Sequence, residues 1–232
     1  MNDPWFVLRS VARQLGSVAA ESVFTGGAVV PLYLDATYGA GVRVTLDVDV
    51  VVDTPSRTDY YRIEAYLRER GWVQPLVEDG PICRWLTPDG VRVDVMPIDG
   101  AALGFTNAWY AAGVSGALQF DVGDEQRVRV FDAATFVATK IAAFDGRGDS
   151  DWYGSHDVED VITLIEGRSA LVDEVAQAPP RVRAFVGLWS RRLLSQPSPH
   201  DIVEGHVSRE GLRSGVLGEV VGRLVALSGL VD

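Results

Sequence analysis

The chain has 232 residues, of which 47% are hydrophobic, and a formal net charge of -11. This length and composition allow one large or two small buried cores and exclude a chain that is disordered by composition. The acidic balance argues against broad, sequence-independent binding of nucleic acid by the whole surface, while a local basic patch stays open.

Two features bear on the compartment. Cys83 is the single cysteine, so no internal disulfide can form, which suits a reducing compartment. The N-terminus lacks the basic and apolar regions of a signal peptide, and nowhere do about 18 apolar residues run together. We therefore expect a soluble, cytoplasmic protein that does not cross a membrane.

The first elements are expected to be a helix, a strand, a glycine turn and a second helix. Residues 4–18 carry apolar side chains at helical spacing, and a short apolar run at 22–24 leads through Gly26 and Gly27 into the apolar segment 28–34. Two glycines let the backbone turn sharply and approach a ligand, and a helix start presents free N–H groups to an anion. A glycine pair that serves only the turn is the alternative.

Residues 45–53 predict a β-strand, because apolar residues alternate from Leu46 to Val52. Asp47 and Asp49 are two residues apart, so both carboxylates project from the same face. Adjacent carboxylates repel each other unless a cation lies between them, and the usual partner is a hard divalent ion, most often Mg2+. The alternative is the solvated outer face of an edge strand.

Helical and strand patterns continue to residue 98. We expect a helix, two β-like runs and a strand at 56–70, 72–77, 82–86 and 91–98. Asp94 falls at the centre of the last strand between two valines, where an acid is costly unless it is paired or bound to a metal. Asp94 therefore extends the pair of Asp47 and Asp49 to a candidate triad.

The predicted secondary structure changes near residue 131, from mixed strands and helices to helices alone. Residues 107–123 predict loops or a short helix, and 126–130 predict one more strand. Helical periodicity follows at 133–144, 157–166, 181–194 and 212–227. We expect an α+β protein with an α/β core over 1–131 and a helical C-terminal domain over 132–232 that completes the nucleotide site.

The glycine pair and three acids resemble a known arrangement. Gly26-Gly27, the R-x-T-x-D-x-D motif and the later acid are together similar to the nucleotidyltransferase superfamily related to DNA polymerase β. The resemblance implies a mixed-sheet core in which the glycine pair holds a nucleoside triphosphate and three carboxylates bind two Mg2+ ions. Two metals suit an in-line displacement because the attacking and leaving oxygens both carry negative charge. On this basis the nucleotide would meet Gly26, Gly27, Arg43, Thr45 and Lys140, and the metals would meet Asp47, Asp49 and Asp94, with Asp94 also activating the acceptor.

Within the superfamily the chain is most similar to the AbiEii/AbiGii group of toxin components, to which the MenT proteins are related. Lys140 in A-T-K-I-A-A-F, followed by Arg147 and by H-D-V-E-D-V with Asp157 and Asp160, is similar to the lysine helix of that group and its later segment. The resemblance implies that Lys140 contacts the triphosphate and that Asp157 orients or deprotonates a group near the site. The chain departs from many members at Gly27, where serine is common, and at His156, where a basic residue is usual.

Plain structural explanations stand beside these assignments. Lys140 could be a solvated helical lysine, and Asp157, Glu159 and Asp160 lie in a predicted first helical turn, where acids suit the helix dipole. The three histidines have no cysteine partners at zinc spacing. Neither a P-loop nor a G-x-S-x-G elbow occurs in the sequence.

We expect a Mg2+-dependent nucleotidyltransferase of the EC 2.7.7 type, which moves a nucleotidyl group from an NTP to an acceptor hydroxyl on a tRNA end or a protein. Four arginines of the helical half favour a tRNA acceptor, namely Arg181, Arg183, Arg191 and Arg192. The acidic surface favours the alternative of a small hydroxyl compound of the aminoglycoside type. A non-catalytic component that binds a nucleotide or a cognate antitoxin is the third interpretation.

Overall fold

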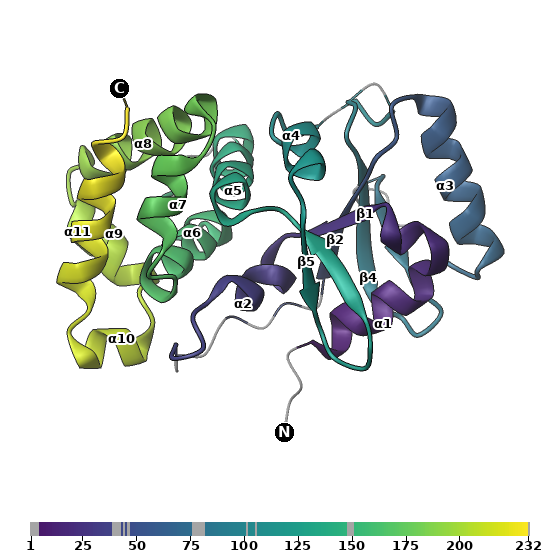
Figure 1. Cartoon of the computed structure of the whole chain (residues 1–232), viewed down its shortest axis with the longest axis horizontal. Helices are drawn as coiled ribbons and strands as arrows, with labels where there is room; N and C mark the ends of the chain where they lie inside the picture. Colours follow the sequence, from purple (N-terminus) through teal and green to yellow (C-terminus); the bar gives the residue numbers. More distant parts are fainter. Residues whose placement is uncertain are drawn as a thin grey trace. The chain divides into compact units, whose positions relative to one another are not determined.

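The structure is a computed structural model of the chain, and it describes residues 5–38, 43, 45, 47–75, 82–100, 102–104, 106–147 and 151–231 (Figure 1). It is an α+β protein, which confirms the expected class. Contacts divide the chain into two compact units, the first formed by Met1–Pro31 and Arg43–Asp132, the second by Leu32–Val42 and Ala133–Asp232. We call them the sheet unit and the helical unit.

A six-stranded mixed sheet forms the centre of the sheet unit, in the order β3-β4-β2-β1-β6-β5. Strand β2 runs parallel to β4 and β1 runs parallel to β6, and the other neighbours are antiparallel. The strands are β1 (Ser22–Thr25), β2 (Asp47–Val52), β3 (Arg84–Leu86), β4 (Arg92–Pro97), β5 (Leu118–Asp121) and β6 (Arg127–Val130). The predicted strand at 45–53 also includes Leu46, and the β-like run at 72–77 includes residues 76 and 77; these lie outside the described residues.

Period-two alternation gives the strands β2, β3 and β4 one apolar face. Its fully buried residues are Val48, Val50, Trp85, Val93 and Val95. The helix α3 (Arg57–Glu69) packs here, since the Tyr60 hydroxyl donates a 2.8 Å hydrogen bond to the carbonyl oxygen of Val95. The residues between these, including Asp49 and Asp94, point to the opposite face.

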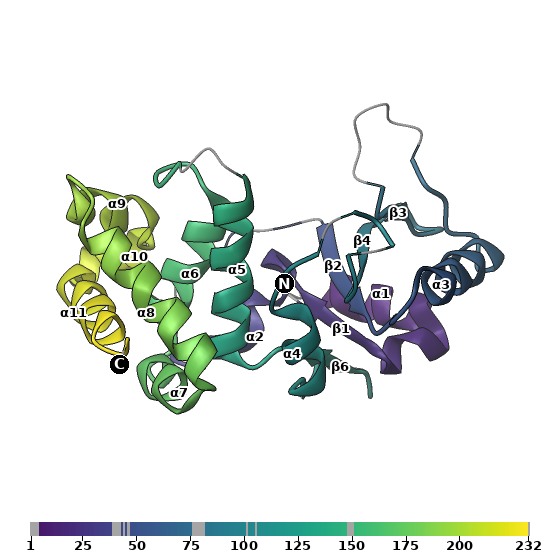
Figure 2. The same ribbon diagram turned by 90° about the horizontal axis from the view of Figure 1, so that it is seen from above.

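Helix α1 (Phe6–Leu15) lies beside the sheet (Figure 2). Its buried apolar residues pack against β2 and β6, and the other helices of the sheet unit are shorter than α1 and α3. A 3-10 turn extends α1 over Gly16–Ala20. The remaining elements are the 3-10 turn Gly27–Val29, α2 (Val30–Tyr33), which passes from the sheet unit into the helical unit, and α4 (Tyr110–Ser115).

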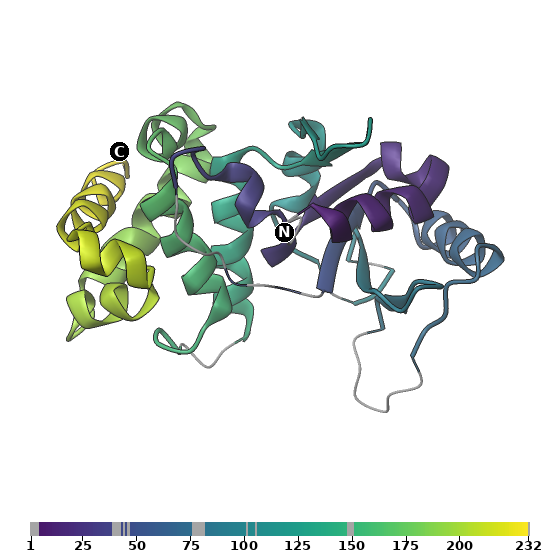
Figure 3. The same ribbon diagram turned by 90° about the horizontal axis from the view of Figure 1, so that it is seen from below.

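Seven further helices make up the helical unit, in which no strand occurs among the described residues. They are α5 (Ala133–Arg147), α6 (His156–Gly167), α7 (Leu171–Gln177), α8 (Pro180–Leu194), α9 (Pro199–His206), α10 (Arg209–Ser214) and α11 (Leu217–Ser228). Helix α5 contacts α6, α7 and α8, and α11 packs along α8 (Figures 1 and 3). Among the described residues, no helix has the length and apolar character needed to cross a membrane.

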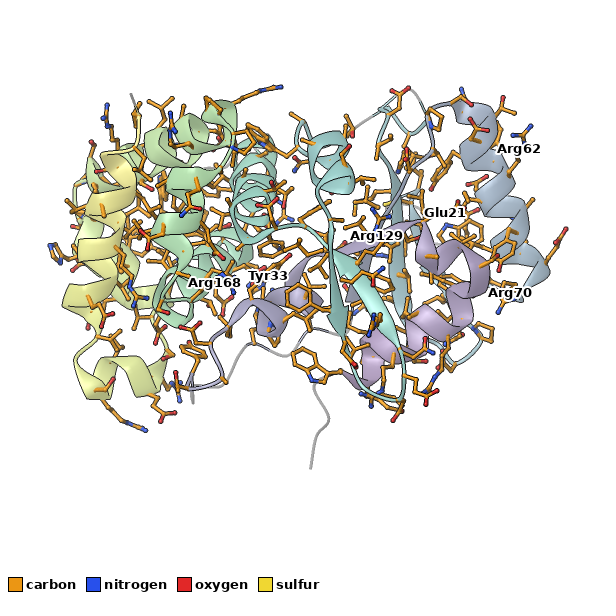
Figure 4. All side chains as sticks on the ribbon, viewed as in Figure 1. Glu21, Tyr33, Arg62, Arg70, Arg129 and Arg168 are labelled. Atoms are coloured by element: carbon orange, nitrogen blue, oxygen red, sulfur yellow. The ribbon has the colours of Figure 1, made fainter. Side chains whose placement is uncertain are left out.

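An N-terminal segment is built into the helical unit. Arg168 Nη1 donates a 2.6 Å hydrogen bond to the carbonyl oxygen of Tyr33, whose ring packs 4.8 Å from that of Phe136 (Figure 4). The Asp35 backbone N–H donates to Gly167, and the Asp35 carboxylate accepts from the backbone N–H of Ser169 at 2.9 Å. Residues 32–38 therefore belong structurally to helices that follow them by more than a hundred positions.

Candidate functional site

Four neighbouring strands place Arg84, Asp94, Asp49 and Thr25 in one row across the sheet. In the strand register Arg84 pairs with Asp94, Asp94 pairs with Asp49, and Asp49 pairs with Thr25. Residues that pair directly across strands point to the same face, and neighbouring strands lie about 4.8 Å apart. The row therefore brings two of the predicted acids next to each other.

Asp47 and Arg92 form the adjacent row. They pair with each other two residues before Asp49 and Asp94 on the parallel strands β2 and β4. Since side chains two residues apart on a strand share a face, the structure brings together Asp47, Asp49 and Asp94 on the face opposite the apolar core. Strand alternation alone predicts this grouping for Asp47 and Asp49, and the parallel register adds Asp94.

The glycine pair lies beside these acids. Gly26 follows β1 with φ +75°, and a Cβ atom on it would fall 1.8 Å from Asp49 Oδ2. A Cβ atom on Gly27 would fall 2.9 Å from Arg43 Nη2 and 3.5 Å from Thr45 Cγ2. Arg43 and Thr45, the other two sequence-predicted nucleotide contacts of this unit, thus lie beside the Gly26–Gly27 turn, and Asp49 leaves no room for a side chain at position 26.

Arg84 and Arg92 pair with two of the acids. The Nε and Nη2 atoms of Arg84 each lie 2.8 Å from one oxygen of Asp94, so the pair is bidentate, and its side chains are 25% and 14% exposed. Arg92 Nε lies 2.7 Å from Asp47 Oδ1 in a more exposed pair. The hydrogen bonds to Asp94 raise the pKa of Arg84 above its already high ordinary value.

The fit of a divalent metal to this face depends on those arginines. Carboxylate oxygens are the donors that Mg2+ prefers, and Asp47, Asp49 and Asp94 supply them from adjacent strand positions. Among the residues that the structure describes, no group of three or more His, Cys, Asp or Glu side chains is arranged to hold a metal ion. The acids fit the metal by type and share one face of the sheet, while Arg84 hydrogen-bonds to both oxygens of Asp94 and Arg92 Nε lies 2.7 Å from one oxygen of Asp47.

The second predicted set lies within the helical unit. Lys140 on α5 places Nζ 2.6 Å from Asp160 Oδ2 and 3.3 Å from Asp157 Oδ1, both on α6. Arg147 Nη1 lies 3.0 Å from the other oxygen of Asp157. All but Arg147 are buried, with Lys140 9% exposed and the two acids 3% exposed. In this arrangement the ammonium group links the two helices.

Residues near this cluster have separate roles. The Ser155 side chain caps α6 by accepting from the backbone N–H of Val158, which places Asp157 in the first helical turn. His156 is exposed and lies 3.0 Å from Glu159. Of the three acids that the sequence places in the first helical turn, Asp157 and Asp160 are turned inward to Lys140, whereas Glu159 pairs with His156.

A surface pocket of about 480 Å³ lies elsewhere on the sheet unit. Its lining residues are Phe6, Arg9, Ser10, Arg13, Gln14, Pro88, Asp89 and Asp124. Its polar side chains hydrogen-bond to one another. Arg13 donates to Asp124, and both Ser10 and Gln14 donate to Asp89. None of the predicted site residues lines this pocket.

Two solved structures are similar to the chain. JHP933 from Helicobacter pylori superposes with a TM-score of 0.49 at 13% sequence identity, over 97% of this chain and 89% of its own. A candidate nucleotidyltransferase from H. pylori superposes with a TM-score of 0.45 at 11% identity, over 97% of this chain and 92% of its own. No protein-family model and no curated protein matches the sequence.

Sequence reasoning missed Arg84 and Arg92. Arg92 had a usable signal, because the alternation that places Asp94 on one face places Arg92 two residues earlier on the same face. No sequence signal indicated Arg84, because its pairing with Asp94 depends on the antiparallel register of β3 and β4. A pairing between strands separated by a turn is a property of the register rather than of either strand.

Proposed function

We propose that the chain is a Mg2+-dependent nucleotidyltransferase, which moves a nucleotidyl group from a nucleoside triphosphate to an acceptor hydroxyl. The observation that carries the proposal is the contact between the Gly26 turn and Asp49. A turn without side chains lets phosphate oxygens approach the backbone, and carboxylates beside it attract the cation that accompanies them.

The metal would be held by Asp47, Asp49 and Asp94. When bound, it supplies neutralisation of the negative charge on the attacking and leaving oxygens. Asp94, between Arg84 and Asp49 in its row, would accept the proton of the acceptor hydroxyl. Its role as a base requires that the bidentate pair with Arg84 be opened.

The triphosphate would lie at the glycine turn. Gly26 and Gly27 would receive its oxygens at the backbone, with the guanidinium of Arg43 and the side chain of Thr45 beside them. Lys140 and Asp157 enter the proposal through the family resemblance. For Lys140 to neutralise phosphate charge, its ammonium group must leave Asp157 and Asp160.

The acceptor is proposed on the resemblance to toxin-like relatives, as a tRNA end or a protein, with a cognate antitoxin as a partner. The net charge of -11 favours a second candidate, a cationic small molecule of the aminoglycoside type. Label transfer from an α-phosphate-labelled NTP to total tRNA or to an aminoglycoside distinguishes these acceptors directly.

Calorimetric titration of each of the four NTPs, with and without Mg2+, tests the central proposal. Wild type and Asp53→Asn should bind an NTP in a Mg2+-dependent manner, because Asp53 is an exposed acid just beyond β2. The double variant Asp47→Asn/Asp49→Asn should lose that binding. Absence of NTP binding in the wild type, or unchanged binding in the double variant, would reject the proposal.

A further inference from the structure

We propose that Arg84 is a resident counter-ion of the metal site that couples the binding of metal to the binding of nucleotide. The inference deepens the proposed function and rests on it, since it takes Asp94 as a metal ligand. It assigns Arg84 a role in substrate binding that neither the pattern of its strand nor any sequence motif indicates.

The guanidinium and a divalent metal compete for the same oxygens. Arg84 makes two 2.8 Å hydrogen bonds that use both oxygens of Asp94. A carboxylate held by such a bidentate fork has its most favourable lone pairs occupied. A metal that binds Asp94 through these lone pairs must therefore displace at least one nitrogen of Arg84.

Arg84 cannot release the Asp94 carboxylate by losing its own proton. An arginine stays charged at all ordinary pH values. The Arg84 side chain must therefore move away to free Asp94. It is 25% exposed, so part of it already lies in solvent. The switch between the two states is thus a movement of one side chain.

The displaced guanidinium has an anion within reach when a nucleotide is bound. Arg84, Asp94, Asp49 and Thr25 stand in one row, and the Gly26 turn follows Thr25 immediately. Strand spacing of about 4.8 Å places Arg84 one strand beyond Asp94 in this row. A triphosphate that shared a metal with Asp49 and Asp94 would lie near this row, and phosphate oxygens match the guanidinium fork as well as a carboxylate does.

Metal and nucleotide therefore assist each other. Metal alone must break the Arg84–Asp94 pair without compensation, whereas metal and triphosphate together replace it by a metal–carboxylate contact and an arginine–phosphate contact. By linkage, each ligand raises the affinity for the other by the same factor. Loss of the guanidinium should then move the two affinities in opposite directions, which a purely structural arginine would not do.

The test is a calorimetric titration of wild type, Arg84→Gln and Arg62→Gln with Mn2+ alone, with a non-hydrolysable NTP analogue alone, and with both. Arg62 projects outward from α3 with a side chain that is 76% exposed, so Arg62→Gln removes the same positive charge away from the site (Figure 4). We expect Arg84→Gln to bind Mn2+ alone about tenfold more tightly and the analogue about tenfold more weakly, with the coupling largely lost. Arg62→Gln should follow the wild type.

Two further variants secure the interpretation. Arg84→Lys keeps the charge without the planar fork, so its Mn2+ affinity should fall between wild type and Arg84→Gln, and it serves if the glutamine variant does not fold. Adding Asp94→Asn to Arg84→Gln should abolish the gain in Mn2+ affinity. Equal or weaker Mn2+ binding by both Arg84 variants would overturn the inference.

Failure of the inference is distinguishable from failure of the proposed function. If the wild type binds the NTP analogue with Mn2+ and loses this binding on Asp47→Asn/Asp49→Asn, while the Arg84 variants keep wild-type metal affinity, only the role of Arg84 is wrong. If no variant binds metal or nucleotide, both proposals fall together.

Discussion

Gly26 and Asp49 fit against each other with no space for a methyl group, since a Cβ on Gly26 would lie 1.8 Å from Asp49 Oδ2. The backbone of Gly26, at φ 75° and ψ -168°, also occupies a region that is essentially restricted to glycine. Gly26→Ala should therefore lose NTP binding and destabilise the protein by more than about 3 kcal/mol. Denaturant unfolding and NTP calorimetry measure the two effects.

Gly90 provides the matched control, and Gly27 provides a comparison for stability alone. Gly90 has φ +84° and no atom within 4 Å of an added Cβ, so Gly90→Ala should show backbone strain alone, about 1 kcal/mol. At Gly27 the added Cβ meets the flexible end of Arg43, which can move aside. Equal stability of the alanine variants at 26 and 90, with intact NTP binding, would contradict the tight fit of the turn to Asp49.

Removal of the Lys140 ammonium should leave two buried acids without their shared partner. We expect Lys140→Met to lower the free energy of unfolding by about 3–5 kcal/mol, the usual cost of an uncompensated buried charge. Arg147→Gln is the control, because the Arg147 side chain is 61% exposed and its pair with Asp157 should contribute less than about 1 kcal/mol. Urea unfolding at neutral pH checks both values.

The same variant separates the two roles of Lys140. Wild-type stability with lost NTP binding would count against the structural role and favour the phosphate contact that the family resemblance implies. Lost stability that is restored in Lys140→Met/Asp157→Asn/Asp160→Asn would identify the cluster as a fixed link between α5 and α6.

Helices α8 and α11 approach each other at Gly187. An added Cβ there would lie 2.7 Å from Val231 Cγ2 and 3.1 Å from the backbone oxygen of Leu227, so Gly187→Ala should cost about 1–3 kcal/mol. Gly222, inside α11, has open space around an added Cβ. Gly222→Ala should therefore stabilise by about 0.5–1 kcal/mol, and thermal unfolding that shifts the same way for both variants would contradict this packing.

Cys83 should behave as an inert thiol until the protein unfolds. Burial, followed by the nearby Asp94 charge, raises its pKa to about 12. The folded state then holds the proton more tightly than the unfolded chain, whose thiol has a pKa of about 8.5. Its contribution to stability is complete below that pH and declines as the pH rises towards 12.

Two measurements check the thiol. Ellman's reagent at pH 8 should react with Cys83 only after denaturant is added. Cys83→Ala should show a smaller loss of stability between pH 8 and pH 10 than the wild type does. Rapid reaction of the native protein would contradict the burial of this side chain.

The elements that show a clear local alternation of apolar and polar residues could be predicted from the sequence. The alternation around Asp47, Asp49 and Asp94 predicted β2 and β4, because one face of each strand is buried and the other carries acids. Strand β5 was missed, since three of its four residues are exposed and it shows no alternation. The short helices α7 and α9 were missed because seven or eight residues carry little periodicity. Spacing placed Asp157 and Asp160 on one helical face, but not against Lys140, because that contact depends on how α5 and α6 pack.

The built-in segment at Tyr33 and Asp35 has a consequence for synthesis of the chain. The sheet unit is interrupted after Pro31 and resumes at Arg43, so the polypeptide passes between the units three times. On the ribosome, residues 32–38 emerge long before Gly167, Arg168 and Ser169, to which they hydrogen-bond. Neither unit can be released whole by a single cleavage, and a gene fragment that starts at residue 133 encodes a domain without one of its own pieces.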